Sequence, residues 1–430
     1  MQLKKLGIGE NRYFLILCVM GAFAILSSTM SKNPVLSPFT ISLGTPTNLE
    51  GIVASASTIP GILVSLPAAS LSDVYGRRRI LLFATFVFAS APFLYLFVSV
   101  WWQLALVRFY HGFATAIFVP VAEATVAERY PKRRGERISD FNSATYVGRG
   151  LAPFLGGSIL YVTSYGYHTL YLAVAVAGVT AFVIALLTVA ESKTQAAAAR
   201  QPMDMRKTTG FVFRGWLQVA RSKGVLVVSF VQACQYYVYG VVEFYFVQYM
   251  IQVAGINPFE VGAIMGAQMI SVIVSRPIMG RFSDRTSRQI PVVLGCIVSA
   301  AMLILIPFTT NLWALAPISI GYGIGFAMAI SSTSPLMCDL TLPSMVGTAM
   351  GFLSTMMDVG QWLGPVLSAL IVTSLTARLP YTELFAILTA LLLTSAMVFY
   401  LSKTAQTANK AKEQNEICEP CKADSQGGQS

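Results

Sequence analysis

Apolar stretches long enough to cross a lipid bilayer recur along this chain, and they limit its fold more than any other feature. About 20 apolar residues in a helix span the hydrocarbon core of a membrane. Only 11% of the 430 residues are charged, whereas a soluble domain has about 25%. The sequence therefore predicts an all-α membrane protein with twelve transmembrane helices. Their approximate ranges are 13–40, 50–70, 79–98, 102–127, 138–161, 168–190, 225–252, 257–279, 289–308, 313–335, 346–373 and 383–402.

The basic residues are distributed unevenly between the predicted loops. Of the 30 Lys and Arg residues, 25 fall in the tails or in alternate loops, and the opposite loops contain only Arg378. Because basic loops stay in the cytoplasm, we expect a multi-pass cell-membrane protein with both termini and the long central loop cytoplasmic. The net charge of +11 then reflects topology and attraction to anionic lipid, and nucleic acid is not an expected partner.

A charged turn between two apolar stretches occurs twice. Asp73 is followed four residues later by Arg77, and 211 residues further on Asp284 is followed in the same way by Arg288. A second set of repeated residues is separated by 212 positions, but at this offset Gly112 does not correspond to a glycine. It relates Pro131, Gly135, Gly148 and Pro153 to Pro343, Gly347, Gly360 and Pro365. Each half has six predicted helices, so the halves are predicted to be parallel repeats with a substrate site between them.

Four segments follow from this pattern. Residues 1–190 form the first six-helix bundle, 191–224 a cytoplasmic linker, 225–402 the second bundle and 403–430 a disordered tail. Phe213, Trp216, Leu217 and Ala220 share one helical face, which predicts a short helix in the membrane interface within the linker. The tail contains a single CxxC, Cys418 and Cys421; a zinc site usually needs four ligands, so no metal is predicted.

Three motifs resemble signatures of the major facilitator superfamily. The stretch from Ala69 to Arg78 is similar to its loop signature G-x-L-x-D-R-x-G-R-R/K, with Ala69 and Val74 as departures. Arg108 to Gly112 matches R-x-x-x-G, and Gly148 to Gly157 is similar to the antiporter signature ending in G-P-x-x-G-G. The resemblance implies two six-helix bundles around a central cavity, and it is strongest to the drug:proton antiporter branch.

Charged residues at membrane depth need a partner, water or a function. Seven are predicted to lie deep: Lys32, Arg108, Glu123, Arg149, Glu243, Arg276 and Asp358. The resemblance implies that helices 1, 4, 7 and 10 line the cavity. This selects Lys32, Arg108, Glu123 and Glu243 as candidates for substrate binding or proton coupling.

Each of these four candidates has a functional and a structural interpretation. Arg108 and Glu123 share a helix face but lie roughly 22 Å apart, so they cannot pair. The resemblance implies proton coupling for Arg108. Glu123 can be functional or simply reach cytoplasmic water. Glu243 lies among tyrosines. It can bind a cation with their rings, carry the coupled proton because burial favours a neutral carboxyl group, or accept structural hydrogen bonds. Lys32, beside helix-loosening Pro34, can contact substrate or neutralise an acid such as Glu243.

The resemblance also implies roles away from the cavity. A latch that steadies the outward-facing state is expected at Asp73, Gly76, Arg77, Asp284, Arg285 and Arg288. The interface between the halves is expected at Gly148, Arg149, Pro153, Gly156, Gly157, Arg276, Asp358, Gly364 and Pro365.

The function predicted from these observations is secondary active transport. The first hypothesis is proton-coupled efflux of an amphipathic or drug-like compound by a monomer. The alternative is a metabolite or organic-anion carrier, suggested by the cations Lys32, Arg108 and Arg149. A membrane enzyme or sensor is a third possibility, but the chain contains no GxSxG, HExxH or GxxxxGK[ST] motif. We therefore expect no catalytic residues, no cofactor and no direct use of ATP.

Overall fold

The computed structural model describes residues 10–64, 72, 75–188, 221–341, 345–374 and 380–402. The regular elements among these residues are helices, and ten of them are long and apolar enough to cross a membrane. The prediction of an all-α membrane fold is therefore confirmed. Asp73, the predicted interfacial helix at 213–220 and the predicted tail with its CxxC lie outside the described residues.

The first half contains the elements up to residue 188. They are α2 (Glu10–Met30), α3 (Leu36–Ser42), α4 (Thr47–Ser55), η1 (Ala56–Thr58), a helical stretch at 59–64, α6 (Arg77–Tyr95), α7 (Trp101–Arg129), η2 (Pro131–Arg133), α8 (Arg134–Val162) and α9 (Tyr167–Thr188). α8 is long enough to span a membrane, but Arg149 and several glycines lower its hydropathy.

The second half contains the elements from residue 223 onward. They are α12 (Lys223–Val241), η3 (Val242–Phe246), α13 (Val247–Gln252), α14 (Pro258–Arg285), α15 (Gln289–Leu305), η4 (Ile306–Phe308), α16 (Leu312–Asp339), α17 (Val346–Ser374) and α18 (Pro380–Leu401). η3 is a π-helix of five residues. It interrupts the seventh predicted span at Glu243.

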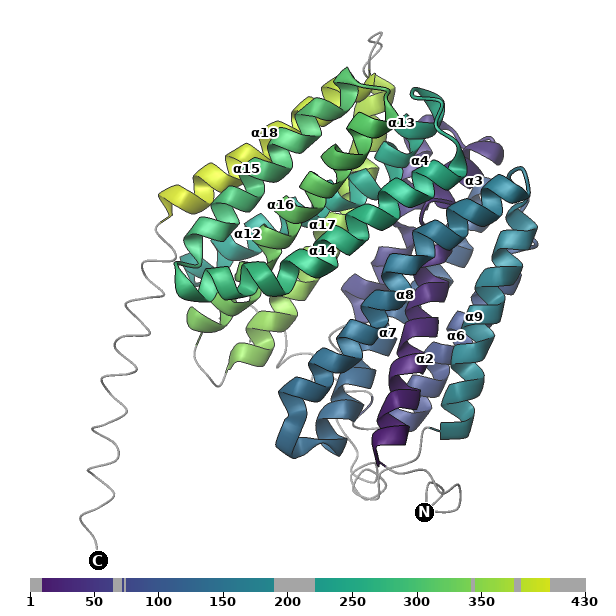
Figure 1. Cartoon of the computed structure of the whole chain (residues 1–430), viewed down its shortest axis with the longest axis vertical. Coiled ribbons are helices and arrows are strands. Elements are labelled where there is room, and N and C mark those ends of the chain that lie inside the picture. The colour runs from purple at the N-terminus through teal and green to yellow at the C-terminus, as the bar shows by residue number, and fades with distance from the viewer. Residues whose placement is uncertain are drawn as a thin grey trace, which may run out of the picture.

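The two halves form two helical bundles (Figure 1). In the first, α2 packs on α8 and α9, and α6 packs on α7 and α9; in the second, α12 packs on α17, and α16 packs on α14 and α15. The bundles contact each other through α8 with α14 and through α4 with α17. They meet near α3, α4 and α13 and diverge towards the side where α2 begins (Figure 1), which is the side predicted to be cytoplasmic.

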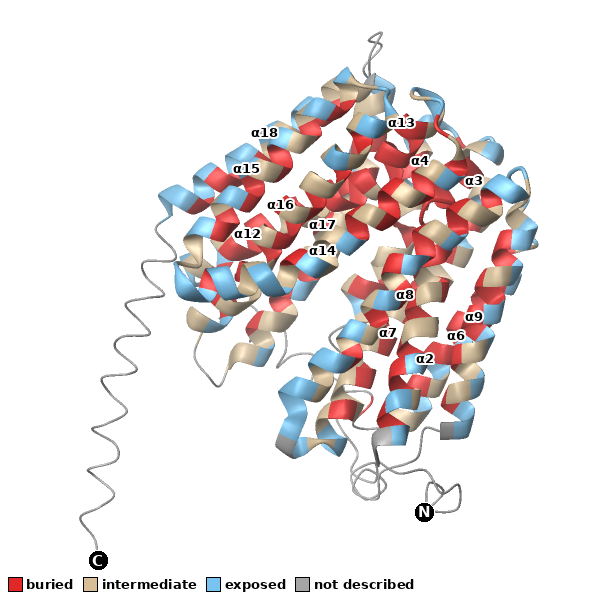
Figure 2. Cartoon of the chain, viewed as in Figure 1, coloured by how far each residue is buried: buried red, intermediate tan, exposed pale blue. Residues whose placement is uncertain are grey.

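Buried residues lie where the helices face one another, and many exposed residues on the outer surfaces are large and apolar (Figure 2). Examples are Leu106, Val176 and Leu187 in the first half and Val274 and Met397 in the second. Such a surface suits contact with lipid chains, because lipid tails are as apolar as the side chains that face them.

The structure places Gly112 in the internal repeat, which is a correction to the sequence analysis. A Cβ on Gly112 would overlap the carbonyl oxygen of Ser57, and a Cβ on Gly323 would meet that of Gln268 at 2.8 Å. Gly323 and Gln268 each lie 211 residues after Gly112 and Ser57, and Glu243 lies 211 residues after Lys32. The offset of 212 had placed Gly112 opposite Ile324.

The change of offset falls in one short loop. Arg77 binds Glu128 and Arg288 binds Asp339, and these two pairs are still related by 211 residues, the separation of Lys32 from Glu243. The glycines and prolines that follow are related by 212. One additional residue therefore lies after Asp339, between α16 and α17.

The two contacts between the bundles are built in the same way. A Cβ on Gly51 of α4 would overlap the carbonyl oxygen of Pro365 in α17, and a Cβ on Gly262 of α14 would overlap that of Pro153 in α8. Glycine is required at both places because the helix backbones approach so closely. These contacts close the bundles together on the side opposite the predicted cytoplasmic side.

Candidate substrate cavity

A cavity of about 450 Å³ lies between the two bundles. Its wall comes from α2, η1, the helical stretch at 59–64, α6, α7 and α8 of the first half and from α12, η3, α14, α16 and α17 of the second. All seven charged residues predicted to lie deep line it. Its volume is within the range of sites that hold small molecules.

Three irregular backbone segments surround the outer end of this cavity. The first is the turn between α2 and α3, where the chain leaves helical geometry at Lys32, Asn33 and Pro34. The second is the π-helix η3, which contains Glu243, and the third is the 3₁₀ turn η1. Non-helical backbone at membrane depth is tolerated where it is enclosed by protein or lines a cavity, and π-helical turns are frequent at functional sites.

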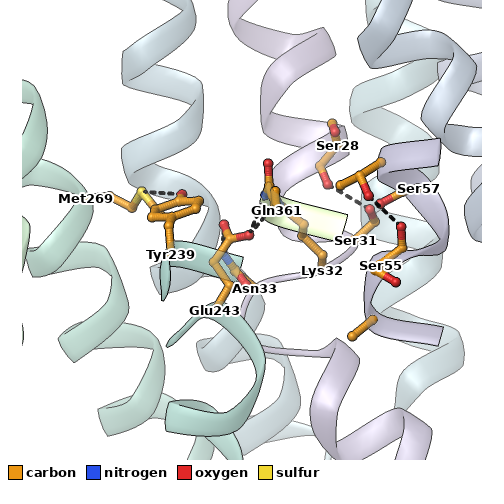
Figure 3. Close-up of polar contacts among 12 residues, drawn as sticks. Ser28, Ser31, Lys32, Asn33, Ser55, Ser57, Tyr239, Glu243, Met269 and Gln361 are labelled. Atoms are coloured by element: carbon orange, nitrogen blue, oxygen red, sulfur yellow. Dashed lines mark hydrogen bonds and ion pairs between the residues drawn. The ribbon is translucent and has the colours of Figure 1, made fainter. Parts of the chain in front are cut away.

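Lys32 and Glu243 form an ion pair across the two halves (Figure 3). The Lys32 Nζ donates to Glu243 Oε2 at 2.8 Å, and Asn33 Nδ2 donates to Oε1 at 3.0 Å. Gln361 Nε2 of α17 donates a further bond to Oε2 at 3.2 Å. Of the two interpretations of Lys32, the structure favours neutralisation of Glu243.

Arg108 is buried and binds the broken second span. Its Nε donates to the carbonyl oxygen of Val53 at 2.9 Å, and its Nη2 donates to the carbonyl oxygen of Ala54 at 3.0 Å and to Ser57 Oγ at 2.9 Å. The carbonyl groups at the end of α4 lack helical partners, and a guanidinium group offers several donors in a fixed fork. Arg108 therefore stabilises the break in this span while it lines the cavity.

Glu123 lies at the cavity end nearer the predicted cytoplasmic side. It is half-buried, and Asn142 Nδ2 of α8 donates to its Oε1 at 2.7 Å. Asp358 of α17 is also half-buried and packs against Gly61 of the second span, where an added Cβ would lie 2.8 Å from Asp358 Oδ2. Among the described residues, Glu123 and Asp358 are the carboxylates that line the cavity in addition to Glu243, the partner of Lys32.

Arg149 and Arg276 lie on either side of the contact between α8 and α14. Both guanidinium groups face the ring of Tyr146, at 5.9 Å and 5.6 Å from its centroid, and Arg276 Nη1 donates to the Tyr146 hydroxyl group. Tyr236 of α12 lies close enough to interact electrostatically with both arginines and with Asp358. The middle of the cavity is therefore a polar region in which cations outnumber acids.

Aromatic and thioether side chains form the apolar wall of the cavity. The rings of Tyr239 and Phe326 stack at 4.9 Å between centroids, and Tyr236 meets Phe326 edge-on at 5.3 Å. The Tyr239 hydroxyl group donates to Met269 Sδ at 3.7 Å (Figure 3). Flexible methionine beside rigid rings is an adaptable apolar surface.

Of the nine residues predicted at the interface between the halves, Arg149 lines the cavity and the other eight divide into two groups. Pro153, Gly157, Arg276, Asp358 and Pro365 contact the opposite half. Three glycines instead pack within their own half, because their close backbone neighbours are Ala22 and Asn33 of the first half and Tyr237 of α12. These glycines are Gly148, Gly156 and Gly364.

The described latch residues lie at the predicted cytoplasmic ends of the helices. Gly76 precedes α6 with a φ of 90°, a conformation that favours glycine. Arg77 Nε binds Glu128 at 2.8 Å, and Arg288 binds Asp339 at 2.7 Å and Asp284 at 2.8 Å. Arg285 is exposed at the end of α14. These ion pairs each connect helices of the same half.

Glu50, a buried acid at the closed outer contact, was not predicted from the sequence. Only 4% of this residue is exposed, and Gln248 Nε2 of α13 donates to its Oε2 at 3.1 Å across the two halves. Glu50 stands at the first position of the predicted span 50–70, where an acid is normally assigned to the water interface. The helix begins earlier, at Thr47, which places Glu50 inside the protein.

Comparison with known proteins agrees with this architecture. The Major Facilitator Superfamily profile matches residues 13–255 and 228–423. The chain is 25% identical over 337 residues to an uncharacterised transporter of this type from Methanocaldococcus jannaschii, covering 77% of this chain and 84% of that protein. It is 24% identical over 359 residues to the multidrug resistance protein MdtG of Dickeya zeae, covering 82% and 84%.

Among solved structures, the nucleoside transporter NupG, crystallised as a mutant, has a similar fold. The TM-score is 0.78 at 14% identity, with 90% of this chain and 99% of that chain covered. The fold and the cavity between two bundles define a multi-pass membrane transporter. The chain belongs to the Major Facilitator Superfamily.

Proposed function

We propose that this transporter exports an amphipathic or drug-like compound in exchange for protons. The observation that carries the proposal is the ion pair between Lys32 and Glu243, which joins the two halves at the outer end of the cavity. These residues occupy equivalent positions of the repeat, 211 residues apart. A titratable bond placed between the moving parts can couple protonation to their movement.

The geometry of this bond supports one direction of coupling. In the conformation closed on the outer side, Lys32 Nζ lies 2.8 Å from Glu243. An adjacent cation favours the ionised carboxylate, so this conformation favours release of the proton. Opening the outer side separates the halves and removes Lys32, and a carboxyl group that is then buried without a cation favours the protonated form. One proton would thus be carried inward per cycle.

The cavity wall and the relatives support the kind of cargo. Tyr236, Tyr239, Phe326 and Met269 offer an apolar face beside polar groups, which suits a molecule with both characters. The relative MdtG is named as a multidrug resistance protein. The sequence contains no GxxxxGK[ST] motif for binding nucleotide, so we propose that an ion gradient drives the transport.

The test is counterflow of an amphipathic dye in proteoliposomes under an imposed pH gradient. Uptake into inside-acidic vesicles should rise with the gradient in the wild type. Glu243→Gln cannot exchange a proton, so it should retain exchange of dye against dye while losing the response to the gradient. Asp140→Asn, at an exposed position of α8, is the control and should behave as the wild type. Transport that ignores the gradient in the wild type would refute proton coupling.

A further inference from the structure

The four cations that line the cavity have different surroundings. Lys32 has a carboxylate partner in Glu243, and Arg108 has three oxygen acceptors in the second span. Arg276 donates to a neutral tyrosine hydroxyl group, and Arg149 faces the ring of the same tyrosine, Tyr146. Across the described part of the chain, neither of these two arginines has a carboxylate within ion-pair distance.

The position of these two arginines makes their surroundings informative. Arg149 lies near the middle of α8 and Arg276 lies well inside α14, and both side chains line the cavity. A charge at membrane depth is costly unless it is paired or hydrated. A second cation beside the first raises this cost, since like charges repel. Asp358 acts electrostatically on Tyr236 together with both arginines, so the two guanidinium groups around Tyr146 still leave an excess of positive charge, which favours an anion from outside the protein.

We propose that Arg149, Arg276 and Tyr146 form a binding site for a carboxylate group of the cargo. Guanidinium groups match the planar carboxylate with parallel N–H donors, and the Tyr146 hydroxyl group supplies one more donor. The stacked rings of Tyr239 and Phe326 bind the apolar part. The cargo is then an amphipathic organic anion. This inference rests on the proposed function and narrows its substrate class.

The site also explains how cargo can bring the two halves together. Arg149 belongs to the first half and Arg276 to the second, and each lies within 6 Å of the centroid of the same Tyr146 ring. An anion that binds both guanidinium groups connects α8 to α14 below the contact of Gly262 with Pro153. Differential binding of cargo to one conformation is what shifts such an equilibrium. Lys32 and Arg108, in contrast, are engaged by protein groups.

The experiment measures binding of three matched ligands to the purified full-length transporter in nanodiscs of phosphatidylcholine. The ligands are 2-naphthoate, the neutral 2-naphthamide and the cationic 2-naphthylmethylammonium. We expect naphthoate to bind at least tenfold more tightly than naphthamide. Arg149→Gln and Arg276→Gln should each lower the naphthoate affinity tenfold or more and leave naphthamide binding unchanged.

Two controls separate a binding site from a structural effect. Arg149→Lys retains the charge and should keep most of the preference for naphthoate, and Arg281→Gln changes an exposed arginine on α14 and should change nothing. Retained naphthamide binding shows that each variant is folded. Adding inorganic phosphate, or phosphatidylglycerol to the nanodisc, tests the other sources of an anion: competition by either one at a lower concentration than naphthoate would overturn the assignment to cargo.

The inference fails if the wild type binds the three ligands equally, or if the preference for naphthoate survives in both glutamine variants. Its failure can be distinguished from that of the proposed function. A wild type that transports dye in response to the pH gradient but binds the three naphthyl ligands equally would overturn only the anion site. A naphthoate preference that depends on both arginines, together with transport that ignores the pH gradient, would overturn only the proton coupling.

Discussion

Neutralising Glu243 is the change that most directly tests the contact between the two halves. In Glu243→Gln, Lys32 keeps its charge and loses its only carboxylate partner among the described residues. Removing one partner of a buried ion pair costs about 3–5 kcal/mol, because the other charge remains buried. The side chains are 9% exposed for Glu243 and 26% for Lys32, so we expect about 3 kcal/mol, at the lower end of this range.

Neutralising the other partner should cost less. In Lys32→Met, the Glu243 carboxyl group can take up a proton and still accept hydrogen bonds from Asn33 and Gln361 at 3.0 and 3.2 Å, so no unpaired charge has to remain buried. The double variant should lose less stability than the sum of the two single variants, with a coupling energy of about 2 kcal/mol. Exchanging the two residues should restore most of the loss, since the positions are equivalent in the repeat and the two amides can turn their oxygens towards a lysine.

Unfolding of the four proteins in mixed micelles gives the free energies for this cycle. The conformational effect is measured separately, by pulsed spin-label distances between Ser42 of α3 and Gln252 of α13, which are exposed on the outer side of opposite halves. About 3 kcal/mol corresponds to a shift of roughly a hundredfold in an equilibrium, so Glu243→Gln should populate longer distances. Free energies that add within about 0.5 kcal/mol, together with unchanged distances, would refute the reasoning.

Three further changes test other parts of the structure. Gly51→Ala places a methyl group against the carbonyl oxygen of Pro365, so spin-label distances should show an opened outer side, whereas Gly135→Ala meets nothing within 4 Å and should leave them unchanged. Arg108→Gln removes three hydrogen bonds and should destabilise the protein by about 3 kcal/mol in micelle unfolding; a loss below about 1 kcal/mol would contradict the assigned role. Glu128→Gln breaks a partly exposed ion pair and should cost less than about 1 kcal/mol, which thermal unfolding can check.

Much of the fold could be predicted because the bilayer limits what a chain can do. Backbone groups in lipid must be bonded within the segment, so an apolar run of sufficient length becomes a helix. The interruption at Pro34 was predictable for a similar local reason, since proline lacks an N–H group and clashes with the preceding turn. The π-helix at Glu243 was not predictable, because the residues of η3 have no comparable local signal.

The composition of the cavity could be predicted better than its contacts. The seven deep charges were identified from their positions in apolar stretches, and all of them line the cavity. Glu50 was missed because it stands at the edge of a predicted span. The arrangement of Arg149 and Arg276 around Tyr146 was missed because it joins α8 to α14 at a separation of 130 residues, and periodicity within a helix carries no information about such neighbours.

The sequence by itself determined that this chain is a helical membrane protein built from two related halves, because hydropathy, proline positions and a repeated turn are local properties. The tertiary structure alone decided which charges are paired. Lys32 meets Glu243, Arg108 meets the end of α4, and Arg149 faces a tyrosine ring instead of an acid. The energy of a charge at membrane depth depends on atoms a few ångströms away, and packing of the two bundles determines which atoms these are.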